Sequence, residues 1–190
     1  MQLIIPTLLA VLSAGSTVVA TPTYGHKSEH DKSKVNKPIF DFAKTFFVTA
    51  TPDQVVNNVS VSAPGEPGAI GYYRFGLQPE TNTICYNITF LGVTGNYSSP
   101  ALTATHIHES ARGRSGPPRI AFPNPVGDDT RRISLGCITG PFKTGILVNG
   151  TDTGDGFEIQ EILDNPTGFN ADAHTTKYLP GVIRGQFPDC

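Results

Sequence analysis

Tryptophan is absent from the 190 residues of the chain, and charged residues are scarce. Without Trp, the chain lacks the Cys–Trp–Cys signature of antibody-type immunoglobulin domains. Asp, Glu, Lys and Arg together make up 16% of the residues, and the net charge is −2. No basic block interrupts the body of the chain. Because duplex nucleic acid is bound by clustered Lys and Arg, the composition predicts no nucleic-acid partner.

Motifs of the common catalytic classes are also missing. The Gly-x-Ser-x-Gly motif of hydrolases does not occur, and no spacing of Ser, His and Asp singles out a catalytic triad. The run Gly113-Arg-Ser-Gly116 is too short for a phosphate-binding loop and lacks the strand–loop–helix context. These absences favour a protein without enzymatic activity.

Glycine (20 residues) and proline (16 residues) are plentiful and separate many short apolar runs. Such a pattern is typical of an all-β domain with frequent turns. One helix is expected at residues 156–163, ended by Asn165-Pro166. The expected strands cover residues 39–49, 55–62, 69–77, 83–91, 101–109, 119–123, 132–138, 142–148, 169–175 and 182–187. We predict an antiparallel β-sandwich or barrel with one short helix.

The first 20 residues have the features of a signal peptide. Residues 3–19 carry no charge, and the apolar run ends in small residues, which fits cleavage after Ala20. The alternative is an uncleaved membrane anchor, which the Pro, Ser, Gly and Thr of this segment disfavour. Residues 21–38 are polar and predict a flexible linker, and residues 39–190 form the domain. The mature chain is expected outside the cell, without contact with a membrane.

Three cysteines leave the disulfide pairing open. Cys85 and Cys137 both lie in apolar, strand-like runs, whereas Cys190 is the last residue. An oxidising compartment favours one bridge. We expect Cys85–Cys137, with Cys190 free or capped, and Cys137–Cys190 is the main competitor.

Four Asn-x-Ser/Thr sequons support a secreted glycoprotein. One such motif arises often by chance, but four in a chain with a signal peptide predict glycosylation. The acceptor residues are Asn58, Asn87, Asn96 and Asn149.

The most patterned stretch of the chain is Thr105-His-Ile-His-Glu109 and the Gly/Ser/Arg/Pro loop that follows it. His106 and His108 are two residues apart, so on a strand both imidazoles point to the same face. A second patterned stretch, residues 172–187, supplies His174. Three neutral imidazoles can bind Cu or Zn, with water as a fourth ligand. Alternatively, each histidine donates to a backbone carbonyl or to Glu109 and ties loops to the sheet.

Arg184 is a charge within an apolar strand, and burying an unpaired charge is costly. Glu109 and Asp172 flank the expected cleft, so we expect one of them to pair with Arg184 and to join the two patterned stretches. The nearby Gly181 and Gly185 are expected to serve a turn and a close backbone approach.

The two patterned stretches resemble the signature blocks of the CHRD domain, first named in chordin. The first block is Thr105-His-Ile-His-Glu109 with Gly113 and Gly116-Pro117; the second is Ala173-His-Thr175 with Pro180-Gly-Val-Ile-Arg-Gly-Gln186. The hairpin with Ile84-Cys-Tyr-Asn87 resembles the family's early block, so the resemblance covers residues 45–187. It implies a secreted immunoglobulin-like β-sandwich or barrel that binds an extracellular protein or glycan. Ser110 stands where the family commonly has Gly.

The His-x-His strand also resembles the copper-binding strand of copper–zinc superoxide dismutases. That family holds copper with four histidines, whereas His106, His108 and His174 would supply three. The remaining His26 and His30 lie in the linker, and the zinc site of that family has no counterpart between Glu109 and Ala173. The primary expectation is therefore a non-enzymatic module without cofactor, and the alternative is a copper-binding protein with a three-histidine site.

Overall fold

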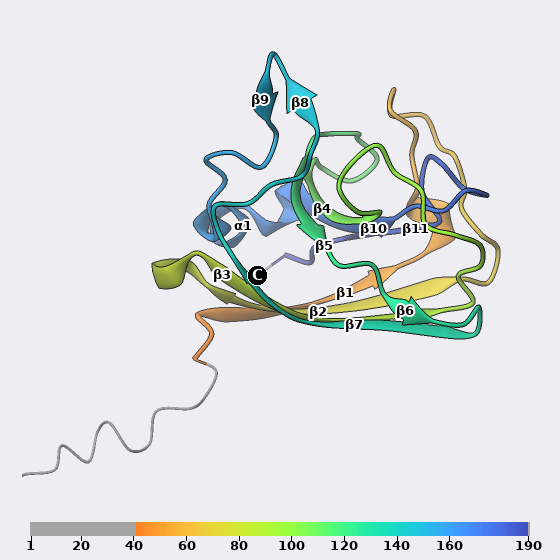
Figure 1. Cartoon of the computed structure of the whole chain (residues 1–190), viewed down its shortest axis with the longest axis horizontal. Coiled ribbons are helices and arrows are strands. Elements are labelled where there is room, and N and C mark those ends of the chain that lie inside the picture. The colour runs from red at the N-terminus through yellow and green to blue at the C-terminus, as the bar shows by residue number, and fades with distance from the viewer. Residues whose placement is uncertain (1–40, 190) are drawn as a thin grey trace, which may run out of the picture. The chain divides into compact units, whose positions relative to one another are not determined.

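Two antiparallel β-sheets pack face to face in the computed structural model of the protein, which describes residues 41–189 (Figure 1). Sheet A has the strand order β1–β2–β3–β7–β6, and sheet B has the order β11–β10–β4–β5. The strands of sheet A are β1 (Lys44–Ala50), β2 (Ile70–Gln78), β3 (Thr83–Leu91), β6 (Val126–Gly127) and β7 (Arg131–Thr139). Those of sheet B are β4 (Thr105–Glu109), β5 (Pro118–Phe122), β10 (Phe169–Ala173) and β11 (Ile183–Gln186).

The remaining elements are short. A hairpin of β8 (Leu147–Val148) and β9 (Thr151–Asp152) projects from the sandwich, and the one α-helix in the described residues is α1 (Ile159–Asp164). Single 3-10 turns lie at η2 (Pro52–Gln54), η3 (Pro79–Thr81) and η4 (Pro166–Gly168). The predicted all-β sandwich with one short helix is confirmed.

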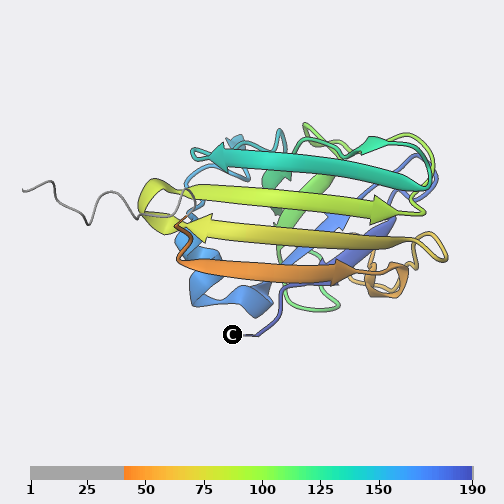
Figure 2. The ribbon, with the colours of Figure 1, turned by 90° about the horizontal axis from the view of Figure 1, so that it is seen from below.

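Alternation along the strands of sheet A builds the core. In β2, Tyr73, Phe75 and Leu77 point inward and are at most 2% exposed, whereas Arg74 points outward. The ring of Phe75 stacks on Phe122 of β5 and on Phe187, at centroid distances of 5.5 and 5.4 Å. Each such side chain contributes about 1.5–3 kcal/mol when it leaves water. The outer face of sheet A lies toward the viewer in Figure 2.

The two sheets are joined along one edge. Backbone hydrogen bonds link Thr51, just after β1, with Arg184 of β11 in both directions, at 2.9 and 3.2 Å. At Gly185 an added Cβ would lie 2.5 Å from the carbonyl oxygen of Thr49, so only glycine permits this approach. Gly181 has φ +148, a turn conformation that glycine adopts freely. Both glycines have the roles expected of them.

Two predicted strands are wrong or much shorter than expected. Residues 55–62 form no strand beyond a single bridge between Val56 and Ser62, because the Asn57 side chain accepts hydrogen bonds from the backbone of Val59 and Val61 and curls the chain. Of residues 142–148, only the last two pair. The helix begins at Ile159 rather than at residue 156, since a capping box formed by Glu158 and Glu161 starts it there.

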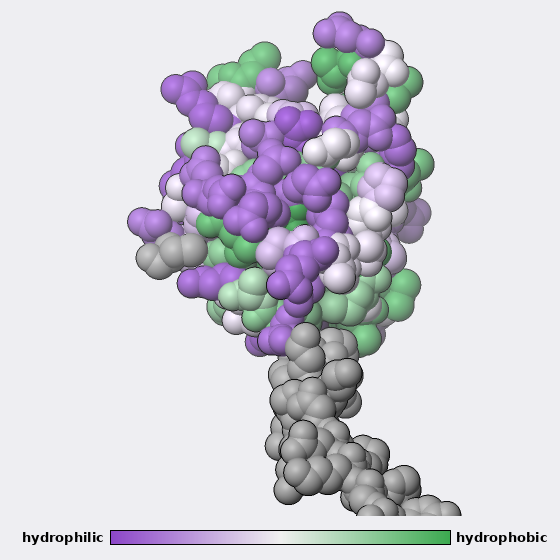
Figure 3. Space-filling view, turned by 90° about the vertical axis from the view of Figure 1, so that its left-hand side faces the viewer, coloured by the Kyte–Doolittle hydropathy of each residue, from purple (hydrophilic) through white to green (hydrophobic). Residues whose placement is uncertain are grey.

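Hydrophilic residues predominate at the end of the domain that carries η3 and α1, with hydrophobic residues among them toward the side of sheet A (Figure 3). Large exposed apolar side chains include Phe47 and Leu135 on the outer face of sheet A and Leu147 in β8. Within residues 41–189, no helix combines the length and the hydropathy needed to span a bilayer.

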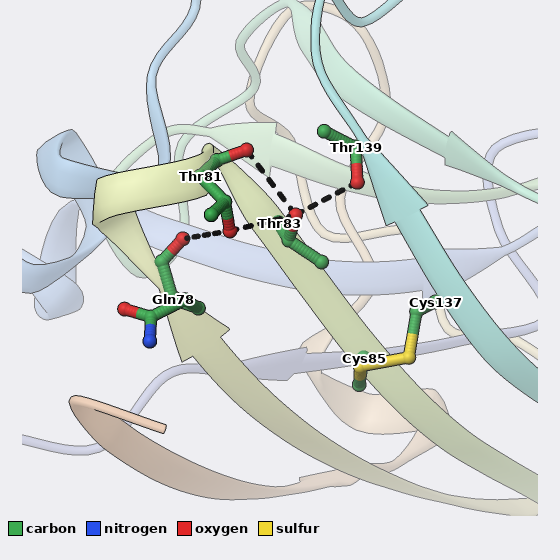
Figure 4. Close-up of a disulfide and its surroundings, with 6 residues drawn as sticks. All are labelled: Gln78, Thr81, Thr83, Cys85, Cys137 and Thr139. Carbon is green, nitrogen blue, oxygen red and sulfur yellow. Dashed lines mark hydrogen bonds between the residues drawn. A yellow bond between two sulfur atoms is a disulfide. The ribbon is translucent and has the colours of Figure 1, made fainter. Parts of the chain in front are cut away.

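The predicted disulfide between Cys85 and Cys137 is confirmed (Figure 4). The two cysteines lie directly opposite each other on β3 and β7. Two residues along each strand, the hydroxyls of Thr83 and Thr139 hydrogen-bond across the same pair of strands at 2.7 Å. The competing bridge from Cys137 to Cys190 is thereby excluded. Cys190 itself, the predicted signal peptide 1–20 and the predicted linker 21–38 lie outside the described residues.

Asp152 of β9 organises the loop below the β8–β9 hairpin. Its carboxylate accepts hydrogen bonds from the backbone N–H groups of Thr144, Gly145 and Gly154. Burial opposes ionisation, but these donors lower the pKa of Asp152 to about 2. A carboxyl whose pKa is depressed by folding adds stability above its unfolded pKa, and that stability disappears as the pH falls through the folded pKa.

Asp152→Asn should therefore destabilise the protein at neutral pH, since the amide presents one acceptor oxygen instead of two. We expect the difference in unfolding free energy between wild type and variant to stay constant above about pH 4 and to shrink between about pH 4 and pH 2. Urea unfolding over this range measures it. A difference that does not change with pH would show that the Asp152 charge contributes nothing to the loop.

Candidate metal centre

Three histidines and one aspartate meet on the outer face of sheet B, beneath the loops that cover it. His106 and His108 come from β4, Asp172 comes from the neighbouring β10, and His174 follows directly after β10. The register places Asp172 opposite His106. Their strand neighbours Ile107, Ala171 and Ala173 point into the core. Alternation along two adjacent strands thus brings all four side chains together on the face away from the core.

Each histidine donates one ring N–H to a backbone carbonyl. His106 Nε2 lies 2.7 Å from the oxygen of Thr103, and His108 Nδ1 lies 2.9 Å from that of Gly116. His174 Nδ1 lies 3.0 Å from the oxygen of Leu179. Because a carbonyl oxygen only accepts, these three ring nitrogens carry the protons. The other nitrogen of each neutral ring therefore presents a lone pair.

The three lone pairs converge on the Asp172 carboxylate. His108 Nε2 lies 3.3 Å from Oδ1, His174 Nε2 lies 3.2 Å from Oδ2, and His106 Nδ1 lies 3.6 Å from Oδ1. One ligand atom from each residue lies within 4.8 Å of all the others. His106 Nδ1, His108 Nε2 and Asp172 Oδ1 are buried without a hydrogen-bond partner.

Unpartnered polar atoms of this kind are costly, because acceptors that face one another inside a protein have lost their water. A cation at their centre, or a proton added to a ring, removes the conflict. Three imidazoles and a carboxylate are donors that suit zinc and copper. The residues present therefore fit a transition-metal ion.

The electrostatics of the cluster favour a positive occupant. Burial would raise the pKa of Asp172, but the rings of His108, His174 and His106 that face its carboxylate hold that pKa well below its usual range. Burial lowers the pKa of His106, so its ring favours the neutral state that a metal requires. Burial also acts to lower the pKa of His174, but the charge of Asp172 outweighs it and raises that pKa. Asp172 therefore remains a buried anion.

A cavity of about 300 Å³ opens beside the cluster. Its lining includes His106, His108, Asp172 and His174, together with Arg184. Loop residues from four places in the sequence close it: 55–58, 99–101, 115–116 and 179–181. The cluster thus has access to a space of small-molecule size on the outer face of sheet B, where these loops gather.

The pairing predicted for Arg184 is wrong. Arg184 is buried, at 6% exposure, but its guanidinium donates to Ser110 Oγ and to the carbonyl oxygens of Ala111 and Arg114. Glu109 forms its ion pair with Arg119 instead, at 2.6 Å. Within the described residues no ion pair joins Arg184 to Asp172, because the loop after β4 supplies enough carbonyl acceptors. The charge of Asp172 still acts on Arg184, although burial dominates and lowers the pKa of the guanidinium.

Arg184→Ala should destabilise the fold by roughly 3 kcal/mol, since it leaves the carbonyls of the 110–114 loop without their charged donor. Arg112→Ala is the matched control: this loop arginine is exposed and donates to Gln54. It should stay within about 0.5 kcal/mol of the wild type. Urea unfolding of the metal-free variants compares them. Equal small losses would mean that Arg184 does not anchor the loop.

The structure brings the three predicted histidines together and adds Asp172, which was predicted as a possible ion-pair partner of Arg184. The signal for this aspartate is its spacing, because Asp172 and His174 are two residues apart, as are His106 and His108.

The four predicted glycosylation residues are all exposed and lie apart from one another: Asn58 at the rim of the cavity, Asn87 on β3, Asn96 in the β3–β4 loop and Asn149 in the β8–β9 turn.

Residues 46–187 match the sequence model of the CHRD domain. The match spans nearly all of the described residues, and the chain belongs to this family of extracellular-type domains. No curated protein and no solved structure matches the chain.

Proposed function

We propose that this member of the CHRD family is a secreted module that binds one transition-metal ion, zinc or copper. The ligands are His106 Nδ1, His108 Nε2, His174 Nε2 and a carboxylate oxygen of Asp172. The observation that carries the proposal is the arrangement of these atoms. Backbone carbonyls hold the far side of each imidazole ring, and the three free ring nitrogens and the buried Asp172 carboxylate lie within 4.8 Å of one another.

The donor set favours Zn(II) and Cu(II) over hard cations. Imidazole suits both metals, and affinity for copper exceeds that for zinc at most sites. When bound, the ion supplies positive charge and fixed geometry. With four protein ligands the site would be of structural type, in which a bound ion would hold strands and loops in place. The ion then ties β4 to β10, while the histidines hold the loops at Thr103, Gly116 and Leu179 through their N–H groups.

Binding of an extracellular protein or glycan is the second candidate function. The loop-lined cavity beside the cluster supports it, because recognition commonly uses loops held by a rigid sandwich. In this account the metal ion fixes the loop positions and the loops contact the partner. Removal of the metal would then weaken binding of the partner without unfolding the domain.

Secretion and glycosylation complete the proposal. The apolar segment 1–20 and the four sequons support them, and so does the Cys85–Cys137 bridge, since disulfides persist in oxidising compartments. All four sequon asparagines are exposed, as an attached glycan requires.

Metal analysis of the secreted chain, purified without a His tag, tests the central part. We expect one equivalent of zinc or copper per chain, or one equivalent taken up on titration of the metal-free chain with either ion. A chain that is folded, binds neither ion and has the same melting temperature with and without them would contradict the proposal.

A further inference from the structure

The outer face of sheet A is an apolar groove that no helix or strand of residues 41–189 covers. Figure 2 looks onto it: β1, β2, β3 and β7 lie side by side, and none of the described elements crosses in front of them. The groove measures about 890 Å³ and is lined by Phe42, Phe47, Leu135 and the Cys85–Cys137 bridge, among others. Phe47 is 49% exposed and Leu135 is 70% exposed. Exposed apolar surface of this kind usually has an occupant.

A sequon asparagine lies in the middle of this groove. The strand registers pair Phe47 with Arg74, Arg74 with Asn87, and Asn87 with Leu135. These four side chains therefore form one row across the sheet, with Asn87 between Arg74 and Leu135. The sequon runs Asn87-Ile-Thr89, and alternation places Asn87 outward and Ile88 in the core. Of the four sequons, only this one lies within a strand.

We propose that Asn87 carries an N-linked glycan whose first sugars lie on this groove. A sugar ring has an apolar face of C–H groups and a polar rim of hydroxyls. The first suits the Phe47 ring and Leu135, and the second suits the Arg74 guanidinium, which sits 4.9 Å from the centre of the Phe47 ring. Attachment at the centre of the groove gives the sugars a high effective concentration there.

The Phe42 ring bounds the groove at Gly76. Gly76 has no side chain, and an added Cβ would meet the Phe42 ring at 2.5 Å, so Phe42 can lie close to the sheet at one end. Phe47 stacks on Tyr72 at 5.9 Å and extends the apolar surface along β1 and β2. A glycan over this surface would shield the apolar face of sheet A from association with other chains.

The inference rests on secretion, which is part of the proposed function. The test expresses the full chain in a eukaryotic secretory host as wild type, as Asn87→Gln and as Thr89→Ala, which removes the sequon but keeps Asn87. Asn149→Gln, in the β8–β9 turn, is the matched control. Peptide mapping detects the glycan at each site, and oxidative footprinting measures the exposure of Phe47 and Leu135. Sedimentation measures self-association.

We expect Asn87 to be occupied in the secreted wild type. Loss of its glycan in either sequon variant should raise the labelling of Phe47 and Leu135 by roughly twofold or more and should promote self-association. Asn149→Gln should change neither. Metal binding should persist in all variants, because the cluster lies on the other sheet.

A secreted chain with Asn87 unmodified would overturn this inference alone. Equal labelling of Phe47 in all variants would also overturn it. Equally high labelling would mean that the sugars extend into solvent, and equally low labelling would mean that another chain covers the face. A chain that stays in the cell without glycan would contradict both this inference and the proposed secretion.

Discussion

Asp172→Asn should weaken zinc binding by at least about 100-fold, because loss of a direct ligand should exceed the 10–100-fold effect of removing a group that only orients a ligand. The substitution keeps the shape of the side chain but removes the anion on which three imidazole nitrogens converge. At a free zinc concentration of 100 times the wild-type Kd, the wild type should gain about 2.7 kcal/mol of stability, and the variant should gain almost none.

The matched control is Glu109→Gln. This carboxylate lies in the same patterned stretch of the chain but pairs with Arg119 and does not belong to the cluster. Its zinc affinity should stay within a few-fold of the wild type. Calorimetric titration of the metal-free proteins measures the affinities, and circular dichroism verifies that each is folded. Equal zinc affinities of wild type and Asp172→Asn would show that Asp172 does not bind the ion.

His174→Gln provides a second test in case Asp172→Asn does not fold. His174 keeps 15% of its side chain exposed, so its replacement disturbs the packing less than that of His106, which keeps 2%. The loss of zinc affinity should again reach at least about 100-fold. Retention of wild-type affinity by this variant would show that the ion, if bound, does not use His174.

Removal of the disulfide by Cys85→Ala/Cys137→Ala should cost about 4 kcal/mol, the second large effect. The bridge closes a loop of 52 residues between β3 and β7. In the chain-entropy model, its loss increases the conformational entropy of the unfolded chain, and this increase lowers the stability by that amount. For a domain of this size, the melting temperature should fall by roughly 8–16 °C.

Thermal unfolding of the oxidised wild type, the reduced wild type and the double variant measures this effect. The last two should melt together, because both lack the cross-link. A difference below about 1 kcal/mol between oxidised wild type and double variant would mean that β3 and β7 remain close in the unfolded chain.

The main strands of sheet A could be predicted from the sequence because one face of each is buried. In β2, apolar residues alternate with Tyr72 and Arg74, and this period of two is visible in the sequence. Residues 55–62 were misassigned because their valines suggest a strand, whereas Asn57 competes for the backbone through its side chain. Propensity does not report such local hydrogen bonds.

The site was predictable only in part. The spacing of His106 and His108 on a strand placed both rings on one face, and the family resemblance drew attention to His174. The role of Asp172 was missed because an acidic residue near Arg184 suggested an ion pair. The carbonyls that orient the rings, at Thr103, Gly116 and Leu179, belong to loops whose paths depend on the assembled sheets. No local pattern in the sequence encodes them.

Anomalous X-ray diffraction from crystals of the zinc-loaded chain, recorded on both sides of the zinc absorption edge, tests the central claim most directly. We predict one strong anomalous peak per chain, bonded to His106 Nδ1, His108 Nε2, His174 Nε2 and a carboxylate oxygen of Asp172. A peak elsewhere on the chain, or zinc-loaded crystals in which these four side chains contact only one another, would contradict it.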